Sequence, residues 1–131
     1  MTQYFSSDTQ RAEGDVGRYG SIADAQAIEA APGVTLRPLL GQRVMLSHVS
    51  LEPHSEAELH THGEEQMGIV LEGSCEFELD GEVRMVGPGD TYHAPPGVPH
   101  GCRTSDERCV ILDIFAPPRA MLVELMRAAD D

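Results

Sequence analysis

The stretch 75–90 alternates short apolar runs with tight-turn residues, and this pattern restricts the fold more than any other feature of the sequence. Within 75–79, three apolar side chains alternate with two glutamates, which is the period of a strand that buries one face. Asp80-Gly81 is a strong signal for a two-residue hairpin turn, and residues 83–86 are expected to form the returning strand. A chain that builds such hairpins folds into a β-sandwich or a β-barrel.

Short strand-like runs continue on both sides of this hairpin, with Gly/Pro turns between them. We expect further strands at residues 43–51, 59–61, 66–71 and 109–115. After Pro117-Pro118, an apolar stripe over residues 121–126 predicts a short C-terminal helix. The sequence therefore predicts an all-β jelly-roll barrel, whose two facing sheets enclose an open-ended interior where a ligand can bind.

The 131 residues fit one domain, which we divide into an N-terminal arm (1–33) and a barrel with its C-terminal helix (34–131). Within the arm, residues 21–31 are expected to form a short helix, because Ser21 and Asp24 resemble a capping pair. A Pro-Gly pair follows this segment and would end the helix.

The charge of the chain argues against several classes of partner. Nine basic and 22 acidic residues give a net charge of −13, whereas nucleic acids and anionic membranes require a basic surface. No apolar stretch approaches the roughly 20 residues of a membrane span, and no signal peptide is visible. The three cysteines are an odd number without zinc-type spacing, so we expect reduced thiols and a cytoplasmic location.

Two separate segments carry residues that suit a metal ion. His60 and His62 are one residue apart, so on a strand they would point to the same face, and Gln66 follows four residues later. His100 comes from a second, Pro/Gly-rich segment. Three imidazoles and one side-chain oxygen suit a divalent zinc, nickel, manganese or iron ion and leave positions open for a substrate. As an alternative, a one-residue shift would place Glu65 on the metal and turn Gln66 away.

These segments resemble the two motifs of the cupin superfamily. The segment from His60 to Gly73 is similar to the first motif, with Gln66 at a position that is usually glutamate, and the segment from Gly89 to His100 is similar to the second. The resemblance implies the cupin double-stranded β-helix. It also implies a homodimer, because small cupins often dimerise.

A closer similarity is to the small cupins of pectin and alginate breakdown, which convert unsaturated uronic sugars to the linear keto form. It is carried by the glutamine variant, by segments 68–73 and 98–101, and by the C-terminal strand. In that family, the positions that match Asp113, Phe115 and Arg119 line the substrate site. The resemblance therefore implies a metal-dependent enzyme that opens the ring of an unsaturated uronate, with a small sugar acid as its substrate.

Asp113 is the candidate catalytic group. It lies in an apolar strand, whose period places it on the same face as Ile111 and Phe115. Burying an unpaired charge costs several kcal/mol, so a partly desolvated carboxylate beside a cavity is a candidate general acid or base. The alternative is an edge carboxylate paired with Arg119 or Arg108.

The other candidates each allow two interpretations. Arg119 is either a bidentate clamp for a substrate carboxylate or an exposed residue of the first helical turn. Phe115 is either a wall on which a sugar stacks or a core residue. Cys102 lies two residues from His100, and we expect a small packed residue rather than a functional thiol. Three other histidines lack a partner at ligand spacing and are expected not to bind metal: His48, His54 and His93.

Two further functions fit the same residues. The three-histidine face could bind iron(II) and oxygen, as in a dioxygenase of a small organic substrate, because these ligands suit several metals alike. The chain could also be a non-catalytic module that binds a small molecule. Oxygen uptake would indicate the first function, and saturable binding without turnover would indicate the second.

Overall fold

The computed structural model describes residues 4–7 and 9–130. Residues 1–3, 8 and 131 lie outside the described residues. They belong to the expected N-terminal arm (1–33) and to the end of the expected barrel segment (34–131). The described elements are a 3-10 helix (Ile22–Asp24), ten strands and one α-helix. Their bounds are β1 (Ile28–Ala31), β2 (Val34–Leu40), β3 (Met45–Leu51), β4 (Glu56–His60), β5 (Glu65–Glu72), β6 (Cys75–Leu79), β7 (Glu82–Val86), β8 (Thr91–Ala94), β9 (His100–Arg103), β10 (Cys109–Ala116) and α1 (Ala120–Asp130).

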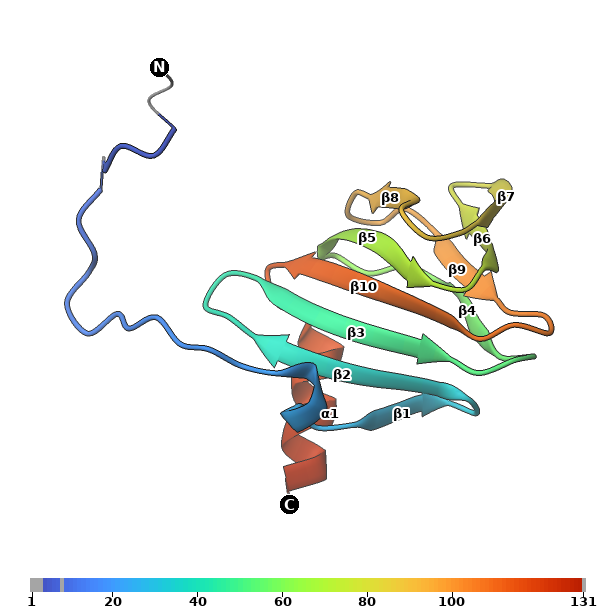
Figure 1. Cartoon of the computed structure of the whole chain (residues 1–131), viewed down its shortest axis with the longest axis horizontal. Coiled ribbons are helices and arrows are strands. Elements are labelled where there is room, and N and C mark those ends of the chain that lie inside the picture. The colour runs from blue at the N-terminus through green and yellow to red at the C-terminus, as the bar shows by residue number, and fades with distance from the viewer. Residues whose placement is uncertain (1–3, 8, 131) are drawn as a thin grey trace.

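The strands form two antiparallel sheets that face each other (Figure 1). The larger sheet has the order β1-β2-β3-β10-β5-β8, and the smaller has the order β4-β9-β6-β7. Helix α1 lies beside β1 and β2 (Figure 1). Residues 16–20 run along the end of β2, and residues 4–7 and 9–10 extend away from the sheets. The expected all-β jelly roll with a C-terminal helix is confirmed. Within the described residues, no helix is long and apolar enough to cross a membrane.

The hairpin predicted at Asp80-Gly81 is present. Leu79 pairs with Glu82 across the turn, so two residues connect β6 to β7. Both turn residues have positive φ angles, 51° for Asp80 and 85° for Gly81. A type I′ turn requires this conformation, and its twist matches that of the flanking strands.

The helix expected over residues 21–31 is wrong for most of its length. Only Ile22–Asp24 is helical, with the Ser21 hydroxyl accepting a hydrogen bond from the Ala23 N–H at 3.2 Å. Residues 28–31 instead form β1, which pairs with β2. Short helices are marginal in isolation, whereas this strand gains a ladder of hydrogen bonds and buries Ile28.

The buried residues between the sheets come mainly from the inner faces of the strands and from helix α1. Alternate residues of β10 point inward, so Ile111, Asp113 and Phe115 are buried on one face, as the period predicted. A second cluster lies under the C-terminal helix, where Leu122 packs with Ile28, Met45 and Phe115. The helix therefore closes one end of the space between the sheets.

Candidate metal centre

Three histidines from two segments come together at one end of this space. His60 ends β4 and faces His100, the first residue of β9, in the strand register, while His62 lies two residues beyond the end of β4. One ligand atom from each histidine can be chosen so that all three lie within 4.8 Å of one another. His60 is exposed, His62 is half-buried and His100 is buried, so the group opens to solvent on the His60 side.

Each imidazole is oriented by a backbone carbonyl. A carbonyl oxygen only accepts hydrogen bonds, so the ring nitrogen that faces it carries the hydrogen and the other nitrogen keeps a free lone pair. In all three rings, Nδ1 is the nitrogen that forms the hydrogen bond with the carbonyl, which leaves each Nε2 available to a metal. The pairs are His60 with Glu58 O (2.7 Å), His62 with Glu64 O (3.0 Å) and His100 with Val98 O (2.9 Å).

Gln66 places a neutral oxygen among these nitrogens. Its Oε1 lies 2.8 Å from Nε2 of His62 and 3.0 Å from Nε2 of His100. Its amide N–H donates to the Tyr92 hydroxyl, which fixes the oxygen toward the histidines. With Nδ1 as the protonated nitrogen, three acceptor atoms face one another at these distances. Such a set of neutral N and O donors fits a divalent transition metal.

Burial keeps two of these imidazoles neutral. Desolvation is the main cause that lowers the pKa of His100 to about 4; the hydrogen bond with the Val98 carbonyl opposes it, and the charges of His60, His62 and Arg119 act in the same direction as burial. The pKa of His62 is also lowered, chiefly by burial. Both residues are therefore uncharged at neutral pH, which is the form that binds a metal.

The alternative ligand Glu65 faces away from the site. It is exposed, and its carboxylate lies 2.7 Å from His93 Nε2. The register of β5 therefore turns Gln66, and not Glu65, toward the histidines. His48, His54 and His93 lie outside the three-histidine group.

Glu64 is a residue of the site that the sequence interpretation missed. Its carboxylate accepts a hydrogen bond from the Ala120 N–H at 2.7 Å and lies 3.3 Å from Nδ1 of His62 and 3.6 Å from Arg119. Burial alone would raise its pKa, but the hydrogen bond from Ala120 and the neighbouring charges lower it below the usual value. One carboxylate thus joins the start of α1 to a histidine of the site.

Asp113 is buried near this group, on the inner face of β10. Desolvation raises its pKa to about 6, although hydrogen bonds with Tyr92 and Gln66 oppose the rise. The Tyr92 hydroxyl donates to Oδ1 of Asp113 and also accepts from Gln66. A chain of hydrogen bonds therefore connects the histidine group to the buried acid.

The expected alternative, in which Asp113 pairs with an arginine, is not what the structure shows. Arg119 lies 3.6 Å from Glu64, and Arg108 lies 3.3 Å from Glu72. Asp113 instead takes its hydrogen bonds from neutral groups. Its charge is not offset by a neighbouring cation, which is consistent with the raised pKa.

Gly68 makes the contact between Tyr92 and Asp113 possible. It lies between the two in the strand registers, and a Cβ at this position would lie 2.7 Å from Oδ1 of Asp113 and closer still to the Tyr92 ring. Real Cβ atoms do not approach other atoms so closely. Only glycine leaves room for the phenol to reach the acid.

We expect Gly68→Ala to lower the thermal midpoint by several degrees, because overpacking a core typically costs about 1–3 kcal/mol. The matched control is Gly63→Ala, since a Cβ there would have no neighbour within 4 Å. Thermal unfolding followed by circular dichroism measures both variants. Equal midpoints for the two variants would contradict the steric role of Gly68.

A cavity of about 820 Å³ runs between the sheets from the histidine group to helix α1. All three residues expected to contact substrate line it: Asp113, Phe115 and Arg119. The same cavity is lined by His60, Gln66 and His100. The Phe115 ring lies 5.7 Å from that of His62, and the Arg119 side chain is 23% exposed. The structure thus brings all the predicted site residues into one region.

Cys102 is half-buried on the wall of this cavity. Its thiol interacts with that of Cys75, which in turn contacts Cys109. The interaction with Cys102 and burial raise the pKa of Cys75 to about 12, although the contact with Cys109 opposes the rise. All three cysteines lie among the described residues and are free.

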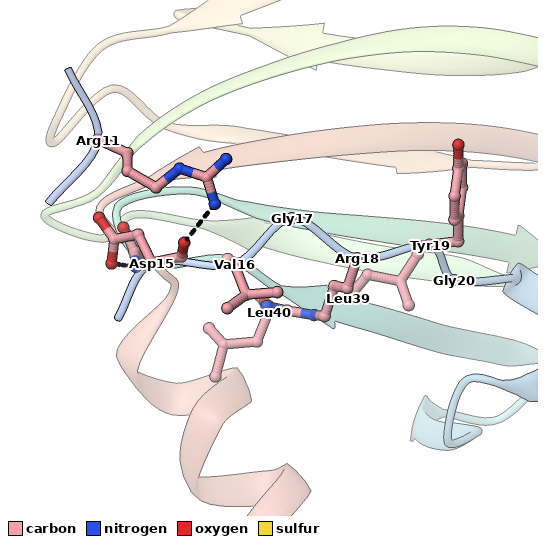
Figure 2. Close-up of a pocket in the computed structure, with 11 residues that line it drawn as sticks. Arg11, Asp15, Val16, Gly17, Arg18, Tyr19, Gly20, Leu39 and Leu40 are labelled. Atoms are coloured by element: carbon pink, nitrogen blue, oxygen red, sulfur yellow. Dashed lines mark hydrogen bonds between the residues drawn. The ribbon is translucent and has the colours of Figure 1, made fainter. Parts of the chain in front are cut away.

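A second pocket lies away from the histidines, between the N-terminal arm and the β2–β3 turn (Figure 2). It has a volume of about 620 Å³, and its polar groups contact one another. Arg11 donates to the Asp15 carbonyl at 3.3 Å, Gln42 donates to the Asp15 carboxylate at 3.0 Å, and Arg18 donates to the Leu40 carbonyl. None of the predicted site residues lines it, so the candidate site is the cavity between the sheets.

Comparison with known proteins identifies the fold family. A family model described as "Cupin domain" matches residues 47–115, which are more than half of the chain. The chain belongs to the cupin family. Cupins commonly bind a divalent metal, and the histidine group of this cupin is a possible site for one.

Two curated relatives match parts of this cupin. "H2HPP isomerase" of Bacillus subtilis is 38% identical over 73 residues, which are 54% of this chain and 30% of that protein. "Pectin degradation protein KdgF" of Dickeya dadantii (strain 3937) is 37% identical over 62 residues, which are 47% of this chain and 56% of that protein. The matches thus cover about a third and just over half of the two relatives.

A solved structure matches most of the fold. The structure of KdgF from Halomonas sp. superposes with a TM-score of 0.75 and 26% identity, covering 82% of this chain and 99% of that one. The expected resemblance to the cupins of pectin degradation is therefore confirmed.

Proposed function

We propose that this cupin is a metal-dependent enzyme that converts an unsaturated uronate to the linear keto-uronate. The observation that carries the proposal is the convergence of three histidines and Gln66 at one end of a cavity whose wall holds the buried acid Asp113. The similarity to two proteins named KdgF supports the choice of a uronate as substrate.

The metal would be held by His60, His62, His100 and Gln66. A divalent transition ion in this set of neutral donors would keep its full charge and polarise the oxygens of a bound acid. Zinc, nickel, manganese and iron all suit these donors, so the residues leave the identity of the ion open.

The remaining roles fall to side chains on the cavity wall. Asp113 would deliver the proton that an enol requires to become a ketone, and Tyr92 would hold its carboxyl group in place. Arg119, oriented by Glu64, would bind the substrate carboxylate. Phe115 would form the face against which the sugar lies. The reaction is an isomerisation, so it requires no oxidant or reductant.

Purified protein should first be analysed for bound metal and then incubated with unsaturated uronates. The expected result is loss of the ultraviolet absorbance of the substrate double bond. Absorbance that persists with each of the four candidate metals would contradict the proposal. Oxygen uptake by the iron-loaded protein would indicate the dioxygenase, and saturable binding without turnover would indicate the binding module.

We propose that this cupin forms a homodimer through the outer face of the larger sheet. Leu39, Leu46, Ile114 and Met67 are successive partners across β2, β3, β10 and β5, so they form an apolar row on that face. Met67 is 49% exposed and Ile114 is 37% exposed, so a second copy would cover surface that water now contacts.

Ile114→Glu is expected to give a monomer, because a charge in the centre of an apolar interface is left unpaired. Light scattering coupled to size-exclusion chromatography measures the mass of each variant. Val83→Glu, at an exposed position on β7 of the smaller sheet, is the matched control and should leave the mass unchanged. A wild-type mass of about 14 kDa would contradict the dimer.

A further inference from the structure

Ser47 lies beside Asp113 on the cavity wall and has no hydrogen-bond partner. The two residues are direct partners in the register of β3 and β10, and both side chains point inward. Ser47 is 1% exposed. Among the buried side-chain oxygen and nitrogen atoms of the described residues, the Oγ of Ser47 is the single one without a hydrogen-bond partner.

Such a hydroxyl does not contribute to the stability of the folded chain. A buried donor or acceptor without a partner is destabilising, so alanine at this position would pack as well and remove the penalty. Groups of this kind are kept where they serve a ligand or a reaction. Ser47 is on the wall of the same cavity as His60, Gln66 and His100.

The Ser47 hydroxyl lies on the side of Asp113 opposite to the residues that form hydrogen bonds with the acid. β5 and β8, on one side of β10, provide Gln66 and Tyr92, which form hydrogen bonds with the acid. Ser47 comes from β3, on the other side of β10. The wall next to it is apolar, because the neighbouring inward-facing pair across β3 and β10 is Val49 and Ile111. A ligand seated here must therefore direct its own polar group at Ser47.

We propose that Ser47 and Asp113 form a subsite that recognises a hydroxyl group of the substrate. A serine hydroxyl both donates and accepts, and an oxygen of the Asp113 carboxyl group accepts in either protonation state, so together they select an alcohol over an apolar substituent. The proposal rests on the proposed function, in which an acid occupies the cavity. It narrows the substrate to a hydroxylated acid whose hydroxyl meets the wall opposite Tyr92.

Isothermal titration calorimetry with the zinc-saturated protein tests this subsite with two probes. D-galacturonate carries hydroxyl groups on a six-membered ring, whereas tetrahydropyran-2-carboxylate has the ring and the carboxylate alone. We expect Ser47→Ala to raise the Kd for galacturonate about tenfold and to leave the Kd for the second acid unchanged. The thermal midpoint of the variant should be equal to that of the wild type or higher.

Ser50→Ala, on the outward face of the same strand, is the matched control, because its hydroxyl meets Arg108 instead of the cavity. It should leave both Kd values unchanged. Equal weakening of both acids by Ser47→Ala would indicate a packing role and overturn the proposal, as would no change in either. The proposal would also be overturned if the wild type bound neither acid. Turnover is not measured, so failure of the uronate reaction would be a separate result.

Discussion

Asp113→Asn is expected to reduce turnover of the uronate about 100-fold or more, because general acid–base catalysis contributes 10²–10⁴-fold and asparagine cannot transfer the proton. The amide oxygen can still accept the hydrogen bond from Tyr92, and asparagine has nearly the same shape. Folding should therefore survive. Removing a buried carboxyl group should leave the thermal midpoint unchanged or raise it.

Steady-state kinetics, metal content and a thermal melt are measured on the same preparation of this variant. Asp106→Asn is the matched control, because Asp106 is an exposed carboxylate that does not itself line the cavity, although its partner His54 does. It should retain full turnover. Wild-type kinetics for Asp113→Asn would remove this residue from the mechanism, even if the metal site is correct.

Gln66→Glu is expected to tighten metal binding about 10- to 100-fold while lowering turnover. A carboxylate at this position adds a full negative charge next to the cation, and such attraction is strong where water is excluded. The same charge makes the ion a weaker Lewis acid toward the substrate. Glutamate also loses the N–H that donates to Tyr92, so the support of Asp113 is weakened.

Competition with a chelator of known affinity gives the metal Kd for this variant, and kinetics with saturating metal give kcat. The same substitution at Gln42, on the exposed turn between β2 and β3, controls for the added charge and should change neither value. An unchanged metal Kd for Gln66→Glu would show that Gln66 is not a ligand. Faster turnover would contradict the argument from Lewis acidity.

Local patterns in the sequence predict much of this arrangement. Period-two alternation correctly placed Asp113 on one face with Ile111 and Phe115, because that period is a property of any strand. The spacing of His60 and His62, combined with the cupin resemblance, predicted a group that the structure does bring together. The turn at Asp80-Gly81 depends only on backbone conformation and was also predictable.

Contacts between distant strands were not predictable in this way. Tyr92 lies on β8, a strand that the sequence interpretation did not identify. β5 lies between β8 and β10, and Tyr92 reaches Asp113 across it because the β5 residue between them is Gly68, which has no side chain. Ser47 lacks any local signal, since its significance comes from its place opposite Asp113. Strand order is set by packing of the whole chain, and a single sequence does not display it.

The carboxylate of Glu64 is shared by the imidazole of His62 and the Ala120 amide, and this sharing bears on how mutational scans of the C-terminal helix are read. A substitution that tilts the first turn of the helix would shift the Glu64 carboxylate and, through it, the imidazole of His62 in the proposed metal site. Reduced ion affinity after such a change would report strain transmitted along the backbone. Such a loss of affinity would not show that the substituted residue is itself a metal ligand.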